Sequence, residues 1–167
     1  METKSVSPGE FQLQYFEHGS GTEKLVLVHG YSASGRIWRL TQEALDPQVF
    51  KTIAISNKGA GDSDRAASED GYSVESFAKD LYLTVDSLSL SDFTLVGHSM
   101  GGATVTQFAL DHPEVIKRLV LLDPAPLGGR PLPDDWGSAC RRSLMAGHRL
   151  KAQPWERRRP LRVSKLS

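Results

Sequence analysis

The chain has 167 residues, a hydrophobic content of 39% and a formal net charge of zero, which suits one globular domain and is too short for two. Its first ten residues lack the apolar run of a secretory signal, and no stretch of about 18 apolar residues indicates a membrane span, so we expect a cytoplasmic protein. A single cysteine, Cys140, excludes an internal disulfide, and no cluster of Cys, His and acidic residues has metal-ligand spacing, so we expect neither a metal nor another cofactor.

Five segments have the patterns of strands. Residues 11–17 alternate apolar and polar side chains, which is typical of a half-buried strand, and we expect it at a sheet edge. Four later apolar runs are nearly continuous, as in strands buried on both faces. They cover residues 25–28, 50–55, 93–96 and 119–122.

Two helices are expected between these strands. Residues 74–88 place apolar side chains at spacings of three and four behind Ser73, a candidate N-cap. A second helix is expected from residue 100 to about residue 110, because Pro113 disfavours helical geometry just before it. The alternation of strands and helices predicts an α/β fold with a mostly parallel sheet and flanking helices.

A glycine-flanked serine stands between the run at 93–96 and the second helix. The segment reads Gly97-His98-Ser99-Met100-Gly101. A tight strand-to-helix turn projects a serine above the sheet, beside the free N–H groups of the helix N-terminus, and Gly97 and Gly101 allow the two backbones to approach each other. Ser99 is therefore the candidate nucleophile, the alternative being an ordinary surface serine in a glycine-rich turn.

A second loop offers a hydrogen-bond donor to the same place. His29, Gly30 and Tyr31 follow the run at 25–28, and the turn that begins at Gly30 can aim a backbone N–H group toward the nucleophile. Together with the N–H of Met100, this gives a candidate oxyanion hole with two donors. We expect His29 to orient the loop by hydrogen bonding rather than to act as a base.

The order of these motifs resembles the α/β-hydrolase fold family, in its serine-nucleophile branch, over roughly residues 10–135. The resemblance rests on His29-Gly30, Trp38, the turn at residues 59–63, the Ser99 turn and Asp123-Pro124 after the run at 119–122. One departure is Ser56-Asn57-Lys58-Gly59, where the family usually has Asp-x-Arg-Gly. The resemblance implies a small-molecule acyl substrate and an acyl-enzyme at Ser99, since relatives that act on haloalkanes or epoxides carry aspartate at that position.

The acid and the base of a catalytic triad are less clear. Asp123 is the candidate acid, with a loop-capping carboxylate as the alternative, and Asp134 and Asp135 are expected to be solvated. The family's histidine follows its last strand, and none here fits well: His98 adjoins Ser99 and should point away from it, and His148 lies among basic residues. His18 and His112 belong to loop or helix-ending segments. The resemblance thus implies a chain that is truncated before the fold's last strands, leaving residues 119–122 as an unpaired edge.

The segment after residue 140 differs from the rest. Residues 1–140 carry 11 Lys or Arg against 19 Asp or Glu, whereas residues 141–167 carry 9 against 1. We predict a hydrolase core over residues 1–139, with the start of a lid at 131–139, and a basic tail over 140–167 that is disordered or unrelated to the fold. The tail supports no specific binding to nucleic acid, because its only aromatic residue is Trp155.

Two hypotheses therefore stay open. The chain is a serine hydrolase that acts through Ser99, or it is a catalytically inactive fragment of such a hydrolase with a binding role or no independent role.

Overall fold

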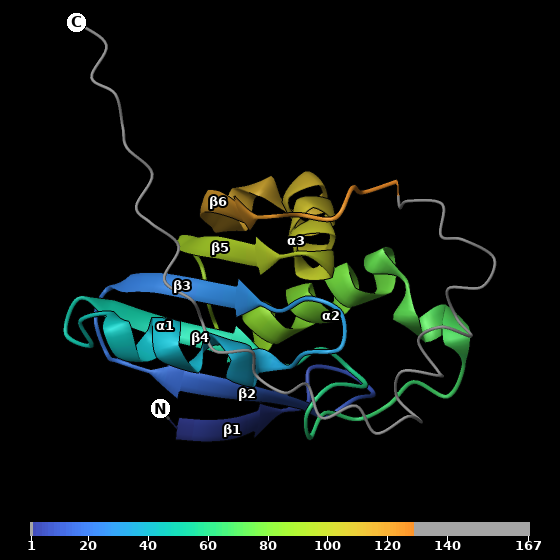
Figure 1. Cartoon of the computed structure of the whole chain (residues 1–167), viewed down its shortest axis with the longest axis horizontal. Coiled ribbons are helices and arrows are strands. Elements are labelled where there is room, and N and C mark those ends of the chain that lie inside the picture. Colours follow the sequence, from blue (N-terminus) through green and yellow to red (C-terminus); the bar gives the residue numbers. More distant parts are fainter. Residues whose placement is uncertain (1, 129–167) are drawn as a thin grey trace, which may run out of the picture. The chain divides into compact units, whose positions relative to one another are not determined.

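The computed structural model describes residues 2–128 and contains a six-stranded, mostly parallel sheet (Figure 1). In spatial order the strands are β1-β2-β4-β3-β5-β6. β3 pairs in parallel with β4 and β5, and β5 pairs in parallel with β6, whereas β1 and β2 are antiparallel to their neighbours. This topology confirms the predicted α/β fold class. The strands are β1 (Glu2–Val6), β2 (Leu13–His18), β3 (Glu23–Val28), β4 (Phe50–Ile55), β5 (Phe93–His98) and β6 (Ile116–Leu122).

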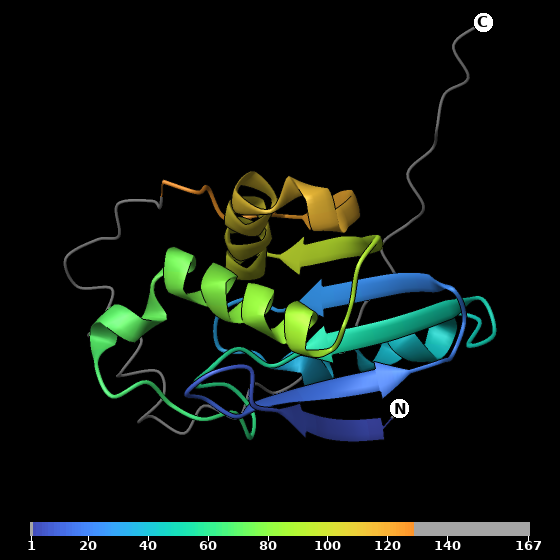
Figure 2. The same cartoon turned by 180° about the vertical axis from the view of Figure 1, so that it is seen from behind.

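Helices cover both faces of the sheet. The longer helices α2 (Val74–Ser87) and α3 (Met100–Asp111) lie on one face, and the short helix α1 (Arg39–Ala44) lies on the other (Figures 1 and 2). Successive side chains of β3 point to opposite faces of the sheet. Val26 and Val28 pack in the cluster that includes α2 and α3, and Leu27 packs with Trp38 on the other face. Three 3₁₀ turns complete the described elements: η1 (Gly35–Trp38), η2 (Glu69–Tyr72) and η3 (Pro113–Val115).

The predicted helices are confirmed with small changes at their ends. The Ser76 N–H donates to the Ser73 hydroxyl at 3.1 Å, so Ser73 is the N-cap of α2. The apolar stripe of α2 is buried against the sheet, whereas its opposite face is exposed. α3 ends at Asp111, shortly before Pro113 begins η3.

Two predictions about the strands were wrong. The strand expected at the sheet edge is β2, and it is not an edge, because residues 2–6 form β1 outside it and Leu13 to Phe16 are all buried. Residues 2–6 are mostly polar and form a short strand, so they lack the apolar pattern from which a strand can be predicted. The run at 119–122 forms part of β6, but its side chains are 37–43% exposed instead of buried on both faces. Within residues 2–128, β6 has one strand neighbour, β5.

Several predictions lie outside the described residues. These are the boundary near residue 140, the lid start at 131–139, the basic tail, and the places of Asp134, Asp135, Cys140 and His148. Among residues 2–128, no helix has the length and apolar character needed to cross a membrane.

Candidate active site

Ser99 occupies a strained turn at the carboxyl end of β5. Its backbone has φ 54° and ψ −121°, a region that side-chain-bearing residues rarely adopt, and α3 begins at the next residue. The Ser99 N–H donates to the Leu122 carbonyl at 3.1 Å, and the Ser99 carbonyl accepts from the N–H groups of Gly102 (2.8 Å) and Ala125 (2.9 Å). The end of β6 and the first turn of α3 thus fix the serine in this conformation.

Close backbone contacts join this turn to the loop after β3. A Cβ atom on Gly101 would lie 2.4 Å from the His29 carbonyl oxygen, and a Cβ on Gly30 would lie 2.9 Å from the Ser99 Cβ. Only glycine leaves room for either approach. The loop at Gly30 is therefore in direct contact with the candidate nucleophile.

His29 is buried and acts as a fixed link between two loops. Its Nδ1 lies 2.7 Å from the Gly30 carbonyl oxygen, and its Nε2 accepts a hydrogen bond from the Asn57 backbone N–H at 3.0 Å. Because Nε2 accepts, the proton is on Nδ1, which donates to Gly30. Burial lowers the pKa of His29, against the opposing effect of the Gly30 carbonyl. Both ring nitrogens are occupied, so the arrangement supports an orienting role and not that of a base.

The two candidate oxyanion donors are the backbone N–H groups of Tyr31 and Met100. Neither donates a hydrogen bond to another residue in the described part of the chain. Met100 is the first residue of α3, where the helix leaves its N–H groups unpaired and its dipole favours negative charge. Tyr31 follows Gly30, which contacts Ser99. Tyr31 and Met100 therefore directly follow the two residues that are in contact, Gly30 and Ser99.

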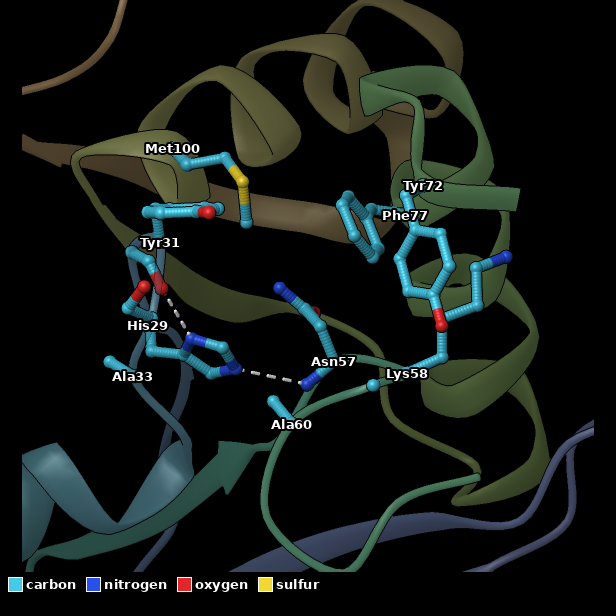
Figure 3. Close-up of a pocket in the computed structure, with 12 residues that line it drawn as sticks. His29, Tyr31, Ala33, Asn57, Lys58, Ala60, Tyr72, Phe77 and Met100 are labelled. Carbon is cyan, nitrogen blue, oxygen red and sulfur yellow. Dashed lines mark hydrogen bonds between the residues drawn. The ribbon is translucent and has the colours of Figure 1, made fainter. Parts of the chain in front are cut away.

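A cavity of about 340 Å³ opens beside these residues. Figure 3 shows Tyr31 and Met100 on one side of it, Tyr72 and Phe77 on the other, and the side-chain amide of Asn57 directed into the space between them. Asn57, Tyr72 and Phe77 are cavity residues that were not predicted from the sequence. Asn57 could have been predicted from its position, because it follows the apolar run that forms β4. This places it at the carboxyl edge of a parallel sheet, where ligands of open α/β folds bind.

Within residues 2–128, no acidic or basic side chain forms a hydrogen bond with the Ser99 hydroxyl. Asp123 is exposed directly after β6, with φ 44°, and its carboxylate forms no hydrogen bond or ion pair with another residue in 2–128. His98, next to Ser99, lines a separate cavity of about 170 Å³ with Trp38 and Leu122.

His18 and His112, the other two histidines within residues 2–128, belong to other parts of the fold. His18 is the last residue of β2, and the ring of His112 stacks on Tyr82 with 3.8 Å between the ring centroids. Among residues 2–128 there is also no group of three His, Cys, Asp or Glu side chains placed to hold a metal ion.

Comparison with known proteins gives consistent matches. The sequence profile described as alpha/beta hydrolase fold matches residues 24–152, more than half of the chain. The chain is 33% identical over 118 residues to bifunctional epoxide hydrolase 2 of Sus scrofa, a match that covers 71% of this chain and 21% of that protein.

Two solved structures are similar in fold. The epoxide hydrolase CorEH superposes with a TM-score of 0.70 and 29% identity, covering 87% of this chain and 51% of that one. The N-acyl homoserine lactonase AidH, complexed with N-butanoyl homoserine, superposes with a TM-score of 0.69 and 25% identity, covering 75% and 46%. The chain thus spans about half the length of these structures and about a fifth of the curated relative.

Proposed function

The chain belongs to the alpha/beta hydrolase fold family, and we propose that it is a serine hydrolase in which Ser99 forms an acyl-enzyme with an ester or another acyl substrate. One observation carries the proposal. Ser99 is held at φ 54° between β5 and α3, with Gly30 packed against it. This conformation is costly for a serine and persists only where the surrounding structure enforces it.

The proposed reaction follows from this geometry. The Ser99 oxygen attacks the substrate carbonyl carbon, a carbon–oxygen bond forms, and the carbonyl π electrons move to the oxygen. The N–H groups of Tyr31 and Met100 stabilise that negative charge, each worth about 10²-fold or more in rate. As the carbon–oxygen bond forms, Ser99 gives up its hydroxyl proton to a general base. When the tetrahedral intermediate collapses, the leaving group departs with the bonding electrons and takes up a proton, and water later hydrolyses the ester, which releases the acid and restores the Ser99 hydroxyl.

The similarity to epoxide hydrolases does not extend to their substrate. Attack of a serine oxygen on an epoxide carbon would give an ether, which has no carbonyl for water to attack, and Ser99 would stay alkylated. An acyl group leaves an ester on Ser99, which water can hydrolyse. The serine therefore favours acyl substrates, and the lactonase AidH is the compared protein whose substrate fits this chemistry.

Within residues 2–128, we assign no side chain as the base that removes the Ser99 proton. No described side chain forms a hydrogen bond with the Ser99 hydroxyl, and a serine without an adjacent base is a weak nucleophile. This observation favours, as a second candidate, a chain that binds acyl compounds at the site without turning them over.

A boronic acid tests the proposal at equilibrium. Butylboronic acid accepts a serine oxygen to give a tetrahedral anion that mimics the intermediate, and the released proton passes to the buffer, so no internal base is required. We expect the 167-residue protein to show a tetrahedral boron signal by ¹¹B NMR, and Ser99→Ala to abolish it.

The matched control is Ser87→Ala, which removes an exposed hydroxyl at the end of α2. It should leave the boron signal unchanged. A signal that persists in Ser99→Ala, or that is absent from the unmodified protein, would refute the assignment of Ser99.

A further inference from the structure

The Asn57 side chain is buried without satisfying its hydrogen-bonding groups. The residue is 6% exposed, and its Nδ2 atom has no hydrogen-bond partner within the described part of the chain. Buried polar groups are nearly always paired, and leaving one unpaired costs free energy. The amide points into the cavity between Met100 and Phe77 (Figure 3), so the cavity is where an acceptor for it would lie.

The position of Asn57 is fixed by the residues that also fix the oxyanion loop. Its backbone N–H donates to His29 Nε2, and His29 in turn donates to the Gly30 carbonyl. Gly30 lines the same cavity and contacts Ser99. The backbone of Asn57, from which the amide extends, is therefore held in a set place relative to the nucleophile.

The rest of the cavity wall near Asn57 is largely apolar or already paired. Tyr72 and Phe77 meet edge to face with 6.2 Å between ring centroids, and the Tyr72 hydroxyl accepts a hydrogen bond from Ala66 N–H at 3.1 Å. Ala33, Ala60 and Met100 contribute apolar surface. Asn57 Nδ2 is thus an unpaired donor beside largely apolar side chains, where a hydrogen bond discriminates strongly between ligands with and without an acceptor.

The charge around the cavity favours a neutral acceptor. Lys58 also lines it, but its Nζ pairs with Asp80 at 2.9 Å and donates to Ser76 Oγ at 2.6 Å. Both nitrogens of His29 are occupied as well. A carboxylate entering the cavity would meet no uncompensated cation among these residues, whereas a ketone oxygen needs only a donor.

Building on the proposed function, we propose that Asn57 determines substrate specificity by donating a hydrogen bond from Nδ2 to a neutral carbonyl oxygen on the acyl chain of the substrate. The scissile carbonyl lies at Ser99, and the chain extends into the cavity toward Phe77. The substrate class is then an oxoacyl compound, with its second carbonyl some bonds away from the first.

Non-hydrolysable amides test this assignment without turnover. Hexanamide and its 3-oxo, 4-oxo and 5-oxo derivatives differ only in the extra oxygen, and binding is followed in ¹H–¹⁵N NMR spectra. The side-chain NH₂ signals of Asn57 are identified by their loss in Asn57→Leu. We expect at least one oxo derivative to bind about two- to tenfold more tightly than hexanamide, the range of one hydrogen bond, and to shift these NH₂ signals.

Substitutions at position 57 separate this role from a structural one. Asn57→Leu should remove the preference for the oxo compound and leave the Kd for hexanamide within about twofold, since the backbone bond to His29 is retained. Asn57→Asp, which replaces the donor with an acceptor, should also lose the preference while keeping the side-chain shape. Two variants guard against the failure of one of them to fold.

The binding test does not require that Ser99 be a nucleophile. Repeated in Ser99→Ala, the preference should persist, so a failure of the boronic acid experiment and a failure of this one are distinct results. The proposal is overturned if no oxo derivative binds more tightly than hexanamide, if none of the amides binds, or if the preference survives both substitutions at Asn57.

Discussion

β5 and β6 are neighbouring parallel strands made of the same apolar residue types, and yet their burial differs. In register, Leu95 lies beside Leu119 and Val96 beside Val120, but Leu95 is fully buried whereas Leu119 is 37% exposed. β5 lies between β3 and β6, and within residues 2–128 β6 has a strand on one side only. An apolar run therefore predicts a strand, while the neighbours of that strand decide how deeply it is buried.

Matched truncations in the two strands should give the largest difference. Leu95→Ala removes a fully buried side chain and should lower the free energy of unfolding by about 2–5 kcal/mol. Leu119→Ala removes a side chain that is already partly solvated, and we expect a loss of about 1 kcal/mol or less. Urea unfolding followed by far-UV circular dichroism measures both. Equal losses would show that β6 is as well covered in solution as β5.

Adding a methyl group at the carboxyl end of β5 should also lower the free energy of unfolding. A Cβ on Gly97 would lie 2.4 Å from the Gly101 carbonyl oxygen, so Gly97→Ala should destabilise the protein by about 1–3 kcal/mol and weaken the boron signal. Gly128→Ala is the control, because its Cβ would meet no atom within 4 Å. If the two alanine variants unfold at the same urea concentration, the turn is looser than these contacts indicate.

The buried His29 directly follows β3, the other neighbour of β5, and the charge of its imidazole should appear in the pH dependence of stability. Because burial lowers the His29 pKa, the unfolded chain binds the proton more readily, and the free energy of unfolding falls as pH drops below about 6.5. His29→Gln should flatten this decline and cost about 1 kcal/mol at pH 7 through weakened hydrogen bonds. A decline of unchanged slope in the variant would assign it to other groups.

The exposed side of β6 should tolerate a charge with the smallest change in stability. Leu121, the partner of Gly97 in the sheet, is 42% exposed, and Leu121→Lys should change the free energy of unfolding by about 0.5 kcal/mol or less. An apolar edge favours association between chains, which a lysine opposes. Sedimentation velocity should therefore show less self-association in the variant. An unmodified chain that stays monomeric at the same concentrations would contradict this expectation.

Much of the fold could be predicted from local patterns in the sequence. The spacing of Phe77, Leu81 and Val85 identified α2, and the glycines around Ser99 identified the turn before α3, because each pattern has one simple geometric solution. β1 could not be predicted in this way, because its polar residues form a strand only through their pairing with β2.

The candidate site residues expected from the sequence are those whose place backbone geometry dictates. Ser99 and the N–H of Met100 belong to the turn that joins β5 to α3, and Gly30 belongs to the loop after β3 and contacts Ser99. From the sequence, Asn57 stands out only as a departure from a family pattern, because its proposed role depends on which side chains from η2 and α2 face it across the cavity. Such contacts between distant segments leave no periodic signal in a single sequence.

The most direct test of the central claim, that residues 2–128 provide a nucleophile and an oxyanion hole but no base, is hydrolysis of p-nitrophenyl butyrate by the 167-residue protein. We expect a rate no more than on the order of 10³ to 10⁴ above the uncatalysed reaction, as for triad enzymes without their triad, and no change in His148→Ala. Fast turnover that both Ser99→Ala and His148→Ala abolish would contradict the claim and identify His148 as the base. Fast turnover that only Ser99→Ala abolishes would contradict it as well, and would place the base among the other histidines.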